Sequence, residues 1–178
     1  MTRASDDRSK TKSHSQSVAG PSLGCEGVQV PRPFRSDRGW TFDMGVDELW
    51  DRLSSYQCYP EWWPWLRHFD ADGGFADGAS WACEVAPPLP YVVRFTVELE
   101  RVEPARAAYA TVHGDVVGEA ELTVEPLTPT RSTARLRSQL APSNPVLRGF
   151  GTVARPLVEW GHDWVLDQGR RQFVERAR

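Results

Sequence analysis

Alternation of apolar and polar residues dominates the second half of this chain. Tyr91–Leu99 shows it most clearly, because Tyr91, Phe95 and Leu99 point to one side while charged residues such as Glu98 point to the other. Side chains of a strand alternate between the two faces of its sheet. The same period extends over 80–85, 105–114, 119–125 and 133–140. Strands with one apolar and one polar face predict an antiparallel sheet with one side in water, whose apolar side needs a cover.

The carboxy-terminal residues supply that cover. Residues 146–177 carry apolar side chains at helical spacing, among them Trp160, Trp164 and Phe173. This spacing is typical of an amphipathic helix. We therefore predict a long terminal helix that lies across the apolar side of the sheet.

Two short helices are predicted between the first strand and the remaining strands. Residues 39–44 alternate and indicate a short strand, whereas Val46–Tyr56 has helical period with acidic residues in its first turn, where the helix dipole favours them. A second helix is expected to begin near Pro60, because proline suits the first helical turn. The predicted order is strand, two short helices, about six strands and a long helix.

The side-chain directions of residues 105–114 stay open in the sequence. Either the alternate set containing Ala110 faces the apolar side, or the set containing Tyr109 and His113 does. Because small apolar residues occupy the first set, the pattern favours His113 on the solvated face.

The segment Tyr59–Leu66 holds three of the eight tryptophans, Trp62, Trp63 and Trp65, together with two prolines. Each tryptophan can bury roughly 150–250 Å² of surface. Such a cluster is a poor fit to a solvated loop. We expect it to form either part of the hydrophobic core or one wall of an apolar pocket.

The first 38 residues differ from the rest in composition. They are rich in Ser, Asp, Arg and Lys, carry a net charge of about +3, and contain too few apolar residues to offset the entropy of ordering them. We predict a disordered tail over 1–38 and one folded domain over 39–178. The domain carries about −6, which argues against nucleic acid as its main partner.

Several other classes of function lack the residues they need. The three cysteines, Cys25, Cys58 and Cys83, have no C-x-x-C spacing, and neither a zinc site nor a disulfide framework is expected. This usage fits a reducing cytoplasm. No secretory leader or membrane span is evident, and no phosphate loop, metal motif or G-x-S-x-G motif is present. We expect no cofactor, and the sequence does not specify an oligomeric state.

Five short motifs, in order, resemble the START-like or SRPBCC superfamily, and more narrowly its bacterial polyketide cyclase/dehydrase-like branch. They are Val46–Asp51, Tyr59–Pro64, Leu89–Tyr91, Gly114–Gly118 and Trp160–Asp163, with Gly169 seven residues after His162. The resemblance covers residues 39–177. It implies an α+β helix-grip fold, in which a curved antiparallel sheet of six to seven strands wraps a long terminal helix and encloses a cavity.

The resemblance also implies where a ligand would bind. It places His162 on the helix that lines the cavity, where a neutral imidazole can orient a carbonyl or move a proton. The alternative is a histidine hydrogen-bonded to backbone between helix and sheet, with Asp163 solvated. Tyr91 is a second candidate acid–base group, unless its hydroxyl reaches the surface. The expected ligand-binding residues are Trp63, Trp65, Trp81, Tyr91, Phe95, Leu122, Leu136, His162, Val165 and Phe173.

Three hypotheses for function follow. The leading one is binding of a hydrophobic or aromatic small molecule, lipid-like or polyketide-like, in the internal cavity. The second is a polyketide aromatase/cyclase-type enzyme that folds a poly-β-ketone chain and uses His162 for proton transfer. The third is a non-enzymatic interaction module with a vestigial cavity.

Overall fold

The computed structural model describes residues 33–88, 91–144 and 151–176. Within them the chain forms a single seven-stranded antiparallel sheet with the order β1-β7-β6-β5-β4-β3-β2. The strands are β1 Phe34–Phe42, β2 Leu66–Asp72, β3 Ser80–Val85, β4 Val93–Glu103, β5 Ala107–Gly114, β6 Val116–Thr128 and β7 Arg131–Pro142. The helices are α1 Val46–Leu53, the 3-10 turn η1 Tyr56–Cys58, α2 Tyr59–Trp62 and α4 Gly151–Arg176.

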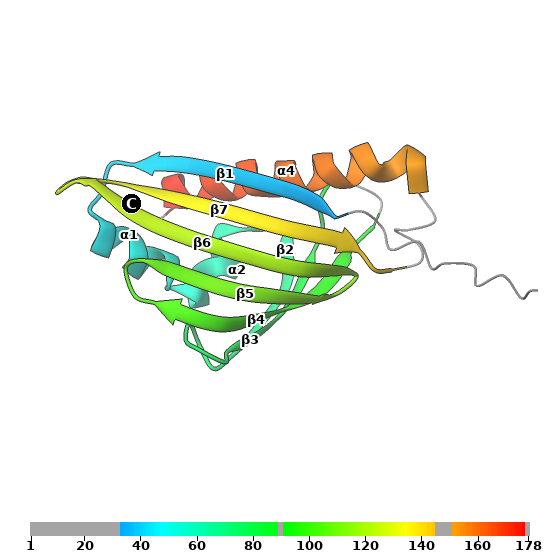
Figure 1. The fold of residues 1–178 in the computed structure, drawn as a ribbon, viewed down its shortest axis with the longest axis horizontal. Helices are drawn as coiled ribbons and strands as arrows, with labels where there is room; N and C mark the ends of the chain where they lie inside the picture. Colours follow the sequence, from blue (N-terminus) through cyan, green and yellow to red (C-terminus); the bar gives the residue numbers. More distant parts are fainter. Residues whose placement is uncertain (1–32, 89–90, 145–150, 177–178) are drawn as a thin grey trace, which may run out of the picture.

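Strands β2 to β7 follow one another across the sheet, and only β1 pairs with a strand distant in sequence. It lies antiparallel to β7, with Phe34 opposite Leu140 and Phe42 opposite Ser132. Helix α4 runs beside β1, and α1 and α2 lie behind the same face of the sheet (Figure 1). The predicted curved sheet, terminal helix and two short helices are therefore confirmed.

The inner face of the sheet carries the small and apolar residues that alternation predicts. Leu99, Val112, Val124 and Ala134 are all buried. On β5 the set containing Ala110 faces inward and His113 is exposed, which confirms the favoured phase of residues 105–114.

Helix α1 closes one end of the sheet. Its Leu49 is fully buried and Trp50 nearly so. Asp47 and Glu48 occupy the first turn, where the helix dipole stabilises their negative charges. Helix α2 has Pro60 in its first turn, as expected, and buries Tyr59 and Trp62. Trp62 of α2 contacts Phe173 of α4, with the ring centroids 5.5 Å apart.

The start of the first strand differs from the expectation. Strand β1 begins at Phe34 rather than at Gly39, so part of the predicted tail belongs to the sheet. Two of the charged residues there belong to its outer face, where Arg35 bonds Gln139 and Asp37 accepts from Arg135, and Arg38 on the inner face pairs with Asp163 of α4. A strand with so many charged residues resembles a solvated tail in sequence. Residues 1–32 lie outside the described residues, so their disorder stays a prediction.

The buried stripe of α4 also differs from the expectation. Trp160 was expected on that stripe, but its side chain is 49% exposed. Gly161 and Phe173 are buried instead, and Val165 packs against the core. Because neighbouring residues lie about 100° apart on a helix, the inward stripe that contains Val165, Gly169 and Phe173 leaves Trp160 on the opposite side of α4.

The early start of β1 is testable by truncation. We expect a chain that begins at Gly39 to lose about 3 kcal/mol or more of unfolding free energy relative to one that begins at Pro33. The shorter chain lacks Phe34, and removal of a buried phenylalanine alone costs about 3–5 kcal/mol. Urea unfolding of the two chains measures the difference. Equal stabilities would show that residues 34–38 contribute nothing to the fold.

Candidate functional site

A cavity of about 340 Å³ lies between the inner face of the sheet and α4. Seven of the ten expected ligand-binding residues line it: Trp63, Trp65, Trp81, Leu122, Leu136, Val165 and Phe173. Residues that line it and were not expected as ligand contacts include Trp40, Tyr59, Phe75, Leu166, Gly169, Arg170 and four alanines. Tyr91, Phe95 and His162 are not among the lining residues.

The space exists because the middle of the sheet is built from small side chains. Ala110 of β5 pairs with Ala120 of β6, Ala108 lies on the same face of β5, and Ala134 lies on β7. Larger residues at these points would meet α4. The sequence could have indicated this space, since four inward positions on neighbouring strands carry alanine.

Two tryptophans of the cluster after α2 attach this end of the domain to α4. The indole Nε1 of Trp63 donates to the carbonyl oxygen of Gly169 at 3.1 Å, and that of Trp65 donates to Gln172 Oε1 at 3.0 Å. Their rings stack with centroids 5.6 Å apart. A Cβ at Gly169 would stand 3.5 Å from the Trp65 ring, at ordinary van der Waals contact, so the indoles lie directly against the helix. The tryptophan cluster is thus a cavity wall as well as core.

Tyr59 stands at the centre of the aromatic side chains behind the cavity. Its ring lies 4.4 Å from that of Trp63 and 6.0 Å from that of Trp81. The hydroxyl donates to the carbonyl oxygen of Leu53. Burial raises the pKa of Tyr59 well above its ordinary value, so this phenol stays protonated and holds the loop after α1 in place.

His162 lies in a different place from the one the resemblance implied. It packs edge-on against the ring of Phe34 at 5.1 Å, and its Nε2 lies 3.5 Å from Ser138 Oγ. It lines a separate hollow of about 280 Å³ between β1 and α4. The physical reason is its position along α4: Val165 and Leu166, one turn further on and on the same face of the helix, line the cavity, whereas His162 lies beside Phe34 at the start of β1.

The electrostatics around His162 favour a neutral ring. Burial lowers the pKa of His162 below its ordinary value, and the neighbouring Asp163 opposes this only in part. Asp163, expected to be solvated, forms an ion pair with Arg38 of β1 at 2.6 Å and lies 3.8 Å from His162 Nδ1. That partner went unrecognised because Arg38 was assigned to the tail.

Tyr91 and Phe95 lie away from the cavity for reasons of strand geometry. Tyr91 precedes β4 and is partly buried, and burial raises the pKa of its hydroxyl. Phe95 lies at the end of β4 opposite Gly114, beside the β5–β6 hairpin. Both therefore belong to the far end of the strand stripe whose Val97 and Leu99 line the cavity.

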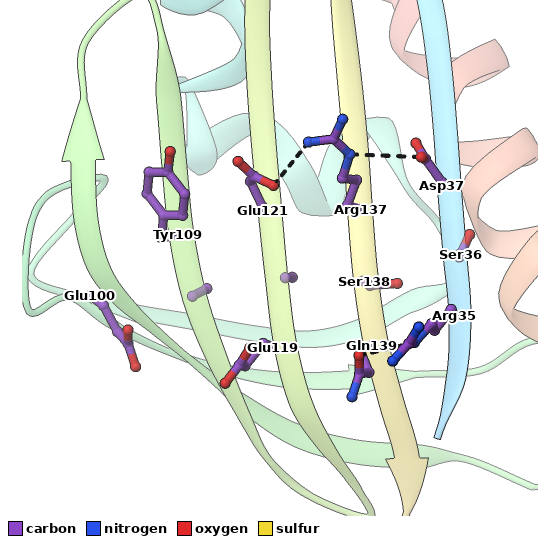
Figure 2. A pocket seen from close by; sticks show the side chains of 12 residues that line it. Arg35, Ser36, Asp37, Glu100, Tyr109, Glu119, Glu121, Arg137, Ser138 and Gln139 are labelled. Carbon is purple, nitrogen blue, oxygen red and sulfur yellow. Dashed lines mark hydrogen bonds and ion pairs between the residues drawn. The ribbon is translucent and has the colours of Figure 1, made fainter. Parts of the chain in front are cut away.

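Six of the twelve residues that line a wide hollow of about 610 Å³ on the sheet are charged (Figure 2). Arg137 lies between Glu121 at 3.3 Å and Asp37 at 3.7 Å. A hydrogen bond from Arg135 lowers the pKa of Asp37. Exposed ion pairs of this kind contribute little to stability, and they occupy the groups that would otherwise bind a charged ligand.

Two negative findings apply to the described residues. No group of three or more His, Cys, Asp or Glu side chains there is arranged to hold a metal ion. Among the described helices, none combines the length and apolar composition that a membrane crossing requires.

Comparison with known proteins identifies the family of this chain. Residues 35–174 match the model of the family described as polyketide cyclase/dehydrase and lipid transport. The chain belongs to this family. The match covers almost all of the described domain, and it confirms the START-like resemblance of the sequence motifs. No curated protein sequence matches this member of the family at a significant level.

Solved structures share the family's fold. A START superfamily protein from Mycobacterium smegmatis has a TM-score of 0.63 at 14% identity, covering 80% of this chain and 96% of that one. The Zhui aromatase/cyclase from a Streptomyces species has a TM-score of 0.64 at 14% identity, covering 82% and 96%. Norcoclaurine synthase from Thalictrum flavum has a TM-score of 0.60 at 11% identity, covering 82% and 94%. At these identities the likeness shows the helix-grip fold alone.

The buried neutral His162 predicts a pH dependence of stability. Its folded pKa lies below the unfolded value of about 6.5, so the unfolded chain binds more protons at mildly acidic pH. The free energy of unfolding is therefore not reduced by His162 above the unfolded pKa, and it decreases as the pH falls below that value. We expect unfolding free energy to drop more steeply from pH 8 to pH 5.5 in the wild type than in His162→Gln. Parallel pH profiles would show that His162 ionises freely in the folded protein.

Proposed function

We propose that this protein binds a hydrophobic or aromatic small molecule, lipid-like or polyketide-like, in the cavity between sheet and α4. The observation that carries the proposal is an open space walled almost wholly by apolar and aromatic side chains, where close packing is the rule in protein interiors. An apolar ligand regains the contacts that the empty walls lack.

The size of the cavity limits the ligand. Its 340 Å³ stands near the lower end of the 300–1,000 Å³ typical of small-molecule sites. This favours a compact aromatic ring system or a single medium-length chain over a two-chain lipid.

The free cysteines Cys58 and Cys83 support a reducing compartment, so we place the ligand and the protein in the cytoplasm.

An aromatase/cyclase-type activity is the second candidate. The neutral state of His162 favours it, because a neutral imidazole can accept a proton from a methylene between two carbonyls. The separate hollow of His162 weighs against it, since a substrate within the cavity would have to extend beyond Val165 to reach the ring. Binding without catalysis therefore stands first, and an interaction module with a vestigial cavity stands third.

Filling the cavity tests the binding function. Ala120 lines the cavity, whereas its neighbour Glu119 is exposed on the opposite face of β6. We expect Ala120→Phe to weaken binding of the neutral fluorescent probe N-phenyl-1-naphthylamine at least tenfold and to abolish the rise in melting temperature that the probe causes. Glu119→Phe, with the same new side chain, should bind like the wild type.

Circular dichroism checks that both variants fold, because overpacking costs about 1–3 kcal/mol. Should Ala120→Phe fail to fold, Leu122→Phe narrows the same cavity more mildly. If the wild type shows no response to the probe or to a panel of lipids and aromatic polyketides, the interaction module is the surviving hypothesis.

The enzymatic alternative needs a separate measurement of turnover and affinity. With a synthetic poly-β-ketone as substrate, we expect His162→Gln to leave the dissociation constant and any cyclisation rate within about twofold of the wild type. A hundredfold or larger loss of rate with unchanged affinity would instead support acid–base catalysis by His162. Equal losses of rate and affinity would indicate that His162 only contributes to binding.

A further inference from the structure

The polar atoms along the cavity wall are nearly all engaged within the protein. The hydroxyl of Tyr59 donates to Leu53, and the indole nitrogens of Trp63, Trp65 and Trp81 donate to α4 or to the loop after β2. For Trp81 the acceptor is the carbonyl oxygen of Gly74 at 2.7 Å. A ligand in the interior of the cavity therefore meets side-chain groups with no hydrogen bond to spare.

Two lining residues are exceptions. Within the described residues, the indole N–H of Trp40 and the guanidinium of Arg170 make no hydrogen bond or ion pair. Among the described residues that line the cavity, Arg170 is the only charged one, and it is exposed. A residue that both lines a cavity and meets solvent lies where the cavity opens. The opening is thus beside Arg170.

Contacts between β1 and α4 place Trp40 near the same part of the helix. The two elements run side by side, since Phe34 contacts His162 at one end and Phe42 contacts Phe173 at the other. Trp40 lies on β1 between these contacts, two residues before Phe42. Trp40 therefore lies beside the part of α4 that precedes Phe173 and contains Arg170.

Both free groups are hydrogen-bond donors, and neither can accept. An indole offers one N–H, and a guanidinium offers a planar fork of N–H groups that matches a carboxylate with two bonds. A ligand end that carries a positive charge or only donors would meet no complementary side chain among these lining residues. A negatively charged acceptor would meet one fixed charge and one further donor.

We propose that the cavity takes a hydrophobic acid, with its hydrocarbon or aromatic body among the apolar walls and its carboxylate bound by Arg170 at the opening, assisted by Trp40. This rests on the proposed binding function and specifies its ligand class. The competing explanation is that Arg170 merely lays its aliphatic stem over the apolar opening while its charge stays in water.

A matched pair of ligands and a matched pair of variants separate these explanations. Decanoate and decan-1-ol share one hydrocarbon chain and differ in the charged end. Each is titrated against bound N-phenyl-1-naphthylamine at pH 8, in the wild type, Arg170→Gln and Arg171→Gln. Arg171 is the control because it is the next residue of α4, is exposed and does not line the cavity.

We expect the wild type and Arg171→Gln to bind decanoate more tightly than Arg170→Gln does, by up to about fivefold, the range of exposed ion pairs. Affinity for decan-1-ol should be equal in all three proteins. The advantage of decanoate should shrink in 0.5 M salt, which screens an exposed charge. Trp40→Phe, which keeps the ring and removes the donor, should weaken decanoate more than decan-1-ol.

The outcomes are distinguishable. If decan-1-ol and decanoate both displace the probe but Arg170→Gln changes neither, the hydrophobic acid is wrong while the binding function stands. If Arg171→Gln weakens decanoate as much as Arg170→Gln does, the effect is general surface charge, and recognition by Arg170 is overturned. If the probe does not bind the wild type at all, the binding function itself fails.

Discussion

The attachment of the tryptophan cluster to α4 is the interaction on which the rest of this structure depends. Trp63 and Trp65 reach the helix through indole N–H bonds at and near Gly169, with their rings against the helix surface. Each such bond contributes only about 0.5–1.5 kcal/mol net, but an unsatisfied buried N–H would cost more. The two bonds therefore fix where the helix lies, and the alanines across the sheet turn that fixed separation into a cavity.

The deep part and the opening of a cavity built in this way recognise different parts of a ligand. Its deep walls offer apolar contact and aromatic edges, whose affinity depends on area and fit rather than on direction. Directional recognition is confined to the opening, where Arg170 and Trp40 keep their donors free. Such a division tolerates different hydrocarbon bodies and discriminates among end groups, which suits a binder of one chemical class better than of one compound.

His162 shows why fold membership leaves chemistry undecided. The residue lies on the expected helix and is neutral at physiological pH, yet its ring faces Phe34 and Ser138 rather than the cavity. The Arg38–Asp163 ion pair lies beside it on the same seam between β1 and α4. One helical turn along the same face of α4 separates a cavity-lining group from a group that helps close the sheet against the helix.

The sequence by itself determined most of the strands, most of their inward faces and the covering helix, because residue alternation reports directly which side of a strand meets water. It also predicted that Trp63 and Trp65 lie either in the core or on the wall of a pocket, since so much apolar surface has to be buried. It missed the first residues of β1, where outward charges resembled a tail. Only the tertiary structure decided which side chains share the cavity, because the rotation of α4 and the ends of the strands depend on contacts between residues far apart in the chain. Those long-range contacts turned Trp160 outward, moved His162 to the seam, and brought Arg170 to the opening.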